Sequence, residues 1–304
     1  MRRRPASRRA FLAEIAGRIY REVMHDQIGL LAAGIAFYAL LAIFPAMASV
    51  LAILGLFLDA AEITEPLAEV TAAMPASAAR LIREQADGIV SQNQGALTLT
   101  AVLGLGAALY ASARGIRHLI QGLNVAFNQV ESRSIPARVR SIGFLSVFVV
   151  GGALLGLGTI AVIPALVHLV PMASHAQEAI FATRWLALFS ISTAGIAVIY
   201  RFGPDRRHRG WHWTFPGALV ACLLWVVASA GFSLYAENFA SYQRSFGTLA
   251  GVVVLLTWLW LSAYVLLLGA ELNAALEAMT HGDIESPYTA WHPPKDERVP
   301  EDRA

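Results

Sequence analysis

Six long apolar runs lie between Ile28 and Leu276, and they constrain the fold more than any other feature of the chain. A bilayer core about 30 Å thick needs roughly 20 apolar residues in helical form to cross it. Lipid cannot satisfy an exposed hydrogen-bonding group of the backbone. The runs cover residues 28–58, 96–113, 141–170, 182–202, 214–235 and 249–276. They predict an all-α, polytopic membrane protein with six transmembrane helices.

The composition supports a membrane location. Of the 304 residues, 57% are hydrophobic and only 14% are charged, whereas soluble domains carry about 25% charged residues. We predict one transmembrane domain at 28–278. It follows a basic cytoplasmic segment at 1–27 and precedes a cytoplasmic tail at 279–304, whose prolines and mixed charges predict disorder. The first run exceeds the roughly 7 to 15 apolar residues of a secretory signal, so we expect it to be retained as a membrane helix.

The distribution of lysine and arginine predicts the orientation of the chain. Nineteen of the 23 lie in the N-terminal segment, in the second-to-third and fourth-to-fifth connections, and in the C-terminal tail. The other four, Arg80, Arg83, Arg184 and Arg244, belong to the opposite side. Because positively charged loops near helix ends stay in the cytoplasm, both termini are predicted to be cytoplasmic.

The ionisable residues do not form a pattern typical of an enzyme. Metal-dependent hydrolysis needs carboxylates and histidines that converge on one or two ions. The eight histidines are scattered, and the one close pair, His208 and His212, lies in an arginine-rich loop that would repel a cation. Cys222 is the only cysteine, which excludes an intrachain disulfide and a thiolate metal cluster. We therefore predict no catalytic residue, no metal and no cofactor.

Two polar residues, Glu271 and Asn273, interrupt the end of the last apolar run. Polar groups at a membrane are costly unless they face a partner or a cavity. One interpretation is an ion pair or hydrogen bond with an arginine of a cytoplasmic loop, which would fix helix packing. The other is a proton or substrate site at the inner mouth of a cavity.

A second set of polar residues follows the second apolar run, on the side that is predicted to be cytoplasmic. Polar residues recur there at steps of three or four: Arg114, Arg117, His118, Gln121, Asn124 and Asn128. The opposite stripe is apolar: Ile116, Leu119, Ile120, Leu123 and Phe127. This pattern predicts an amphipathic helix. Its polar face is either simply solvated or binds anionic lipid headgroups. Arg117 and Asn124 are its candidate functional residues, and Asn124 is the one that we expect to form hydrogen bonds.

The connection at 59–95 is the one strongly acidic segment between the apolar runs. Ser77 is a candidate cap of a short helix within it. Such a helix could cover an outward cavity as a lid, or simply connect two spans.

Three stretches of the chain have a distinctive order and spacing. They are LAAGIAFYALLAIFPAM at 31–47, RFGPDRRHRGWHWTFPGALVACLLW at 201–225 and YQRSFGTLAGVVVLLTWLWLSAYVLLLGAELNAALE at 242–277. With them the chain resembles the YihY/BrkB family of bacterial inner-membrane proteins, over about residues 10 to 280. The resemblance implies six spans with both ends inside, in the bacterial inner membrane. Members of that family were formerly labelled ribonuclease BN, and later descriptions favour transport of lipids or envelope components.

Two classes of function are compatible with these features. The first is a transporter or flippase of a lipid-like or envelope-related substrate, which should have a polar-lined cavity between its helices. The second is a non-transporting membrane scaffold for envelope machinery, which should be tightly packed throughout. The residues give no support to a ribonuclease. The expected partner is the lipid bilayer rather than nucleic acid, and a homo-oligomer is compatible with the sequence.

Overall fold

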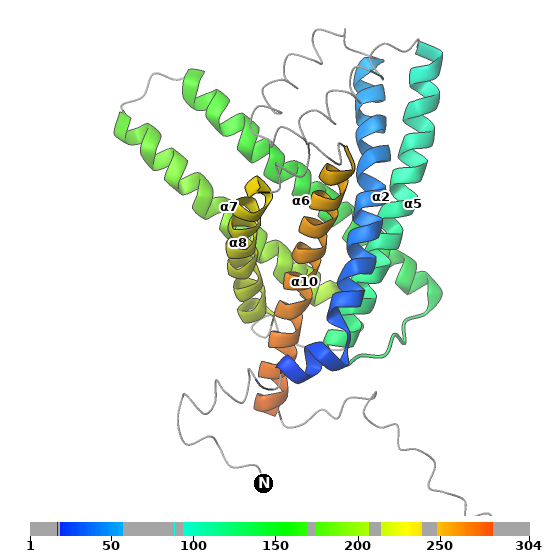
Figure 1. Ribbon diagram of the computed structural model, residues 1–304, viewed down its shortest axis with the longest axis vertical. Coiled ribbons are helices and arrows are strands. Elements are labelled where there is room, and N and C mark those ends of the chain that lie inside the picture. Colours follow the sequence, from blue (N-terminus) through cyan, green and yellow to red (C-terminus); the bar gives the residue numbers. More distant parts are fainter. Residues whose placement is uncertain are drawn as a thin grey trace, which may run out of the picture.

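The computed structural model describes residues 17, 19–56, 88, 94–169, 174–206, 214–238 and 248–281 (Figure 1). Its helices, in chain order, are α2 (Ile28–Gly55), α5 (Gln94–Ala126), α6 (Ile135–Leu169), α7 (Ser174–Phe202), α8 (Phe215–Asn238) and α10 (Thr248–His281). All six are long and apolar enough to cross a membrane, and the described residues contain no strand. The predicted all-α fold with six spans is confirmed.

Four helices, α5, α6, α7 and α10, begin or end well beyond the predicted apolar runs. α5 continues to Ala126, because the amphipathic stretch that follows the apolar run keeps its helical periodicity and contains no proline. α6 begins at Ile135, directly before Pro136, whose fixed φ and missing N–H suit the first turn of a helix. α10 ends at His281, so the first residues of the predicted tail are helical.

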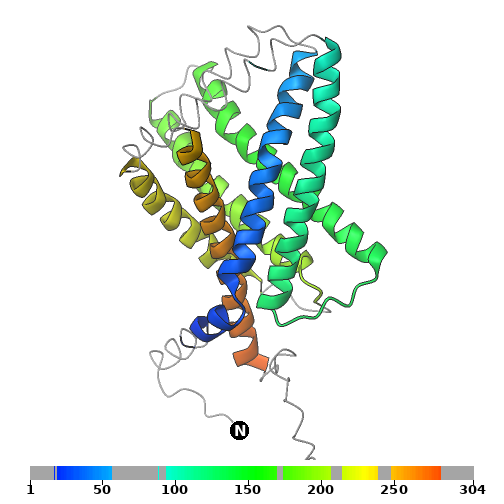
Figure 2. The same cartoon turned by 45° about the vertical axis from the view of Figure 1, so that its right-hand side comes forward.

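The helices form a ring in which each packs against two neighbours. Helix α2 lies along α5, α5 touches α6, and α6 touches α7. Helix α7 packs on α8, α8 packs on α10, and α10 closes the ring against α2. Helices α5 and α10 also meet across it. Figures 1 and 2 show α2 and α5 side by side over their length, whereas α6 and α7 lean away from them toward one end.

One apolar cluster joins all six helices, and it lies toward one end of the ring. We call the end at which α2 begins and α10 ends the basal end, and the opposite end the distal end. Besides the first turns of α2, the cluster contains Leu123 of α5, Leu145 of α6, Tyr200 of α7, Ala221 of α8 and Leu267 of α10. Because α5 and α7 end, and α6 and α8 begin, at the basal end, all of these residues lie in the basal half.

A second, smaller cluster lies at the distal end. It contains Leu51 and Ala52 of α2 and Leu97 and Ala101 of α5. Among the described side chains, it joins only these two helices. The buried apolar cluster that all six helices share is therefore basal, and the second buried cluster among the described side chains joins α2 to α5.

Helices α8 and α10 approach each other most closely at two glycines. A Cβ added to Gly217 would collide with the carbonyl oxygen of Gly269 and with the side chain of Asn273. A Cβ added to Gly269 would lie 2.5 Å from the hydroxyl of Tyr200 and 2.6 Å from the Cβ of Ala221. Glycine at both positions lets the two backbones touch, and this contact sets the position of the last turns of α10.

Candidate functional site

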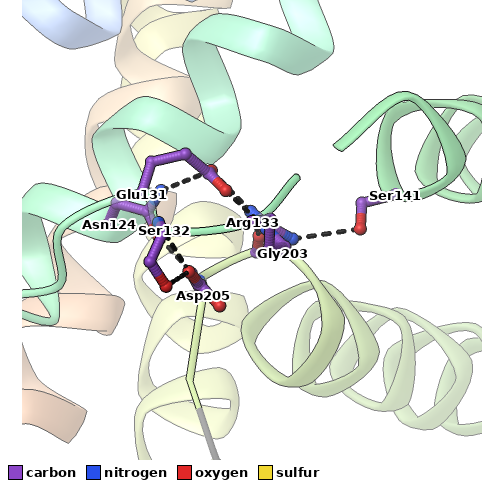
Figure 3. A network of polar contacts seen from close by, with 7 residues as sticks. All are labelled: Asn124, Glu131, Ser132, Arg133, Ser141, Gly203 and Asp205. Atoms are coloured by element: carbon purple, nitrogen blue, oxygen red, sulfur yellow. Dashed lines mark hydrogen bonds and ion pairs between the residues drawn. The ribbon is translucent and has the colours of Figure 1, made fainter. Parts of the chain in front are cut away.

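Polar side chains from several helices meet at the basal end (Figure 3). We call the following set the basal network: Asn124, Glu131, Ser132, Arg133, Ser141, Gly203 and Asp205. It joins the end of α5, the connection to α6, the first turns of α6 and the residues that follow α7. These segments meet beside the apolar cluster, so the network lies where the basal ends of the helices already converge.

Arg133 is the centre of the basal network. Its Nε donates to Oε1 of Glu131 at 2.6 Å and its Nη2 donates to Oε2 at 2.7 Å, which gives a bidentate pair. Nη2 also donates to the carbonyl oxygen of Gly203 at 3.1 Å, and Nη1 donates to Oγ of Ser141 at 3.0 Å. One guanidinium therefore binds the α5–α6 connection to both α6 and the end of α7.

The Glu131–Arg133 pair has shifted protonation equilibria. The hydrogen bonds from Arg133 hold the pKa of Glu131 below its ordinary value, against the opposing effect of burial. The same hydrogen bonds raise the pKa of Arg133 above its usual value. Both groups are thus charged at neutral pH, and the pair stabilises the fold electrostatically.

Asn124 and Asp205 form the second half of the basal network. The buried Asn124 donates from Nδ2 to Oε2 of Glu131 at 3.0 Å, and its Oδ1 accepts from the backbone N–H of Asp205 at 2.7 Å. Oδ2 of Asp205 accepts from the backbone N–H and the Oγ of Ser132, at 2.8 and 2.6 Å. Asn124 thus bonds to two loops that are far apart in the sequence.

An ion pair continues the polar contacts from α7 to α10. The guanidinium of Arg206 donates to the carboxylate of Glu277, and both side chains are almost fully buried. The same guanidinium lies over the ring of Phe127, 4.0 Å from its centroid, a cation–π arrangement. The last turns of α10 are therefore bound to the segment that follows α7.

Asn273 joins α10 to the beginning of α8. Its Oδ1 accepts from the backbone N–H of Gly217 at 2.7 Å, and its Nδ2 donates to the carbonyl oxygen of Thr214 at 3.0 Å. The N–H of Gly217 is one that a helix start leaves without an intrahelical acceptor, and the carbonyl oxygen of Thr214 also accepts from the N–H of Ala218. Asn273 is fully buried, and in this geometry it connects two helices rather than facing an arginine.

Glu271 differs from Asn273 although only one residue separates them on α10. Its side chain is fully buried, and neither carboxyl oxygen has a hydrogen-bond donor among the described residues. The titratable groups that act on it are Glu22 and Asp26, from the segment that precedes α2. The arginine partner that one interpretation of the sequence offered is not beside Glu271 in the described part of the chain.

Arg117 is exposed and does not belong to the basal network. The apolar stripe of its helix, Ile116, Leu119, Ile120, Leu123 and Phe127, is buried in the shared cluster. The polar face is thus divided: Asn124 faces other protein segments and Arg117 faces outward. Binding of lipid headgroups by Arg117 stays a prediction.

Several residues of interest lie outside the described part of the chain. His208 and His212 are among them, as are nearly all of the acidic connection at 59–95 and the tail beyond His281. Within the described residues, no group of three or more histidine, cysteine, aspartate or glutamate side chains could hold a metal ion.

Sequence reasoning missed most of the basal network. It selected Asn124 but not Glu131, Ser132 or Asp205. Asp205 bonds to Ser132 across 73 residues of sequence and to Asn124 across 81. Two signals could have found them. Glu131 is the only acid in a short basic connection, and Asp205 follows a proline directly after a membrane span.

Comparisons with known proteins agree with the fold. A family model described as Virulence factor BrkB matches residues 19–292. A UPF0761 membrane protein of Aeromonas salmonicida is 28% identical over 276 residues, which cover 89% of this chain and 90% of that relative. The Bacillus subtilis protein named as ribonuclease-like YfkH is 28% identical over 265 residues, which cover 84% and 92%. A UPF0761 membrane protein of Photobacterium profundum is 31% identical over 258 residues, which cover 84% and 78%. No solved structure matches the chain.

Proposed function

The chain belongs to the virulence factor BrkB family of membrane proteins, and from this premise we propose that it is a transporter or flippase of a lipid-like or envelope-related substrate. The observation that supports this proposal most is the shape of the helical ring. All six helices share one buried apolar cluster at the basal end, whereas the buried apolar cluster described at the distal end joins α2 to α5.

A ring that is closed at one end suits alternating access. Substrates of membrane transporters bind between helices that rock against one another, and the two ends open in turn. Here the basal end is closed by the apolar cluster and the basal network, and α6 and α7 lean away from α2 and α5 toward the distal end (Figure 2). This arrangement supports a state that is open toward the distal side. The apolar residues of the six helices favour a substrate with lipid chains.

A non-transporting scaffold is the alternative. It would need no opening at either end, and its helices would pack equally well along their whole length. The uneven distribution of the two apolar clusters favours the transporter. Similarity to a relative named as ribonuclease-like does not change this preference, because the described residues include no group suited to bind a catalytic metal.

We place the basal end in the cytoplasm of a bacterial cell, with the domain in the inner membrane. Seven described arginines support this orientation, since they lie in the last turns of α5 and α7, in the first turns of α6, and beside them: Arg114, Arg117, Arg133, Arg138, Arg140, Arg201 and Arg206. Positive residues next to spans remain cytoplasmic. A reporter fused after residue 304 should be cytoplasmic and one inserted at residue 72 periplasmic; two reporters on the same side would contradict the proposal.

Movement of a labelled lipid tests the proposed transport. The purified chain is reconstituted in vesicles that contain phosphatidylglycerol labelled with nitrobenzoxadiazole, and dithionite is added outside. A transporter of such lipids lets the reductant quench more fluorescence than the outer leaflet alone contains. Quenching limited to the outer leaflet, in vesicles that contain correctly folded protein, would favour the scaffold.

A reversible cross-link at the basal end gives the matched control. The side chains of Ser132 and Asp205 face each other, with Oγ of Ser132 2.6 Å from Oδ2 of Asp205, so the double variant Ser132→Cys/Asp205→Cys places two thiols across the basal network for an oxidative cross-link. It is made with Cys222→Ser, which removes the native thiol. If the basal end must open during transport, oxidation of the double variant to the disulfide should stop lipid movement. Reduction of the disulfide should restore it. Each single cysteine variant should be insensitive to oxidation.

A further inference from the structure

Glu271 is a buried carboxyl group without a hydrogen-bond donor. It is 0% exposed, and both of its oxygens lack a donor among the described residues. An ionised carboxylate in such a position has lost its water without gaining a partner, and the energetic cost is large. The buried Glu277, two turns further along α10, avoids this cost through its ion pair with Arg206. Glu271 needs a counter-charge or a proton.

Among the described residues, no basic side chain acts on Glu271. Two carboxyl groups act on it, those of Glu22 and Asp26, which lie one helical turn apart in the segment that precedes α2. Helix α2 has no charged residue, and α8 has no basic residue. The basic groups of α5 are Arg114, Arg117 and His118, and His118 stacks on Tyr38 of α2.

Binding of a proton allows these carboxyl groups to form hydrogen bonds with one another. Ionised carboxylates only accept hydrogen bonds, so no bond can form between two of them. When one carboxyl is protonated, Glu22 and Asp26 are both placed to share a hydrogen bond with Glu271. A metal ion is a poorer solution, because the described residues contain no group of three acidic or histidine side chains that could hold one.

A chain of titratable side chains leads from this carboxyl to the surface. Nδ1 of His25 lies 2.9 Å from Oδ1 of Asp26. The exposed fraction falls from 61% for the side chain of His25 to 11% for Asp26 and to 0% for Glu271. Gln27, with φ of 49°, turns the chain between these residues and α2. The turn places an imidazole at the solvent and a carboxyl beside α10.

We propose that Glu271 is a proton-binding site that exchanges its proton with the basal side through Asp26 and His25. Protonated His25 donates from Nδ1 to Oδ1 of Asp26, and Asp26 then donates to a carboxyl oxygen of Glu271. The imidazole regains a proton from water, so that one proton has moved and no other bond has changed. Binding of the proton is independent of the proposed transport; its use to drive transport rests on that function.

Reaction with an apolar carbodiimide tests the protonation of Glu271. Dicyclohexylcarbodiimide reacts with a carboxylic acid: the acid proton passes to a carbodiimide nitrogen and the carboxyl oxygen bonds to the central carbon. When the full chain in vesicles is treated, the peptide that contains Glu271 should gain the mass of the carbodiimide. The extent of labelling should fall as the pH rises. Glu277, which is equally buried but paired with Arg206, is the control and should stay unlabelled. Glu271→Gln, which keeps the shape of the side chain, should lose the label.

Two results would overturn the proton site. One is the absence of label on Glu271 at neutral pH in the folded protein. The other is protection of Glu271 by added Na⁺, Mg²⁺ or Ca²⁺ at constant pH, which would indicate a metal cation instead. The infrared band of a protonated carboxyl provides a second measurement, because it should be present in the wild type and absent from Glu271→Gln.

The exchange route has its own test. After transfer to heavy water, the infrared band of the protonated carboxyl shifts at the rate at which the proton exchanges. Asp26→Asn and His25→Ala should keep the band but slow its shift, whereas an unchanged rate in both variants would contradict the route. Movement of labelled lipid is measured on the same samples. If Glu271→Gln moves lipid like the wild type, coupling fails while transport stands; if the wild type moves none, transport fails while the proton site stands.

Discussion

At the basal end, six helices share a buried apolar cluster and are connected by the side chains of Arg133, Asn124, Asn273 and Arg206; at the distal end, the described buried cluster connects α2 to α5. The basal side chains bond to loops and helix ends, whose backbone groups lack an intrahelical partner. The basal contacts are therefore the ones whose loss we expect to cost most.

Substitution of Gly217 should have the largest effect on stability. A Cβ there collides with the carbonyl oxygen of Gly269 and with the side chain of Asn273, so Gly217→Ala forces α8 and α10 apart at the basal end. The expected cost is about 3 kcal/mol, at the upper end for an overpacked contact. The apparent Tm, followed by tryptophan fluorescence in detergent, should fall strongly.

Gly231 provides the matched control on the distal half of the same helix. A Cβ added to it meets nothing within 4 Å. Gly231→Ala should leave the apparent Tm unchanged or raise it, because alanine favours a helix over glycine by about 1 kcal/mol. An equal fall of the apparent Tm in Gly217→Ala and Gly231→Ala would show that the two halves of α8 are packed alike.

Removal of Arg133 should have the next largest effect. Arg133→Ala deletes the bidentate pair with Glu131 and the bonds to Gly203 and Ser141. Hydrogen bonds to charged groups contribute about 2 kcal/mol, and Glu131 would be left without its counter-charge. The apparent Tm should fall, whereas Arg140→Ala, which removes an exposed arginine of α6, should change it little. If the apparent Tm fell equally in the two variants, the basal network would not be among the contacts that hold the ring closed.

The sequence predicts the spans better than the contacts between them. Hydropathy and helical periodicity are local signals, so the six helices and the buried stripe from Ile116 to Phe127 could be predicted. Glu271 and Asn273 can be selected because they interrupt an apolar run, and Asn124 because it lies on the polar face of an amphipathic helix. The roles of these residues depend on tertiary contacts, which a local pattern does not contain.

The missed residues illustrate that limit. Ser132 and Asp205 bond to each other across 73 residues, and each is ordinary in its own loop. Glu22 and Asp26 carried a weak signal, since they are two acids one turn apart in a segment that is basic overall. Nothing local indicates that the chain turns at Gln27 and places them beside Glu271.

The contribution of Glu131 should depend on pH. Hydrogen bonds from Arg133 hold the pKa of Glu131 below its ordinary value of 4.5, so the folded state binds this proton more weakly than the unfolded chain does. The stabilisation is complete above about pH 4.5 and is lost as the pH falls through the lowered pKa. Glu131→Gln should therefore cost about 1 kcal/mol at neutral pH, and the difference in apparent Tm from the wild type should narrow in acid. If the difference in apparent Tm stayed constant down to the lowest pH at which the protein folds, the pairing of Glu131 with Arg133 would be contradicted.

The smallest effect is expected at the distal end. Oγ of the buried Ser49 on α2 donates to the carbonyl oxygen of Ala101 on α5 at 2.9 Å. Hydrogen bonds between membrane helices contribute about 0.6 kcal/mol on average, so Ser49→Ala should lower the apparent Tm only slightly. Ser190→Ala is the control, because Oγ of Ser190 donates within α7 to Leu186 and joins no second helix. A loss for Ser49→Ala as large as that for Arg133→Ala would mean that the distal end of the α2–α5 pair is held as firmly as the basal end of the ring. The proposed opening would then have to occur between this pair and the other four helices, rather than within it.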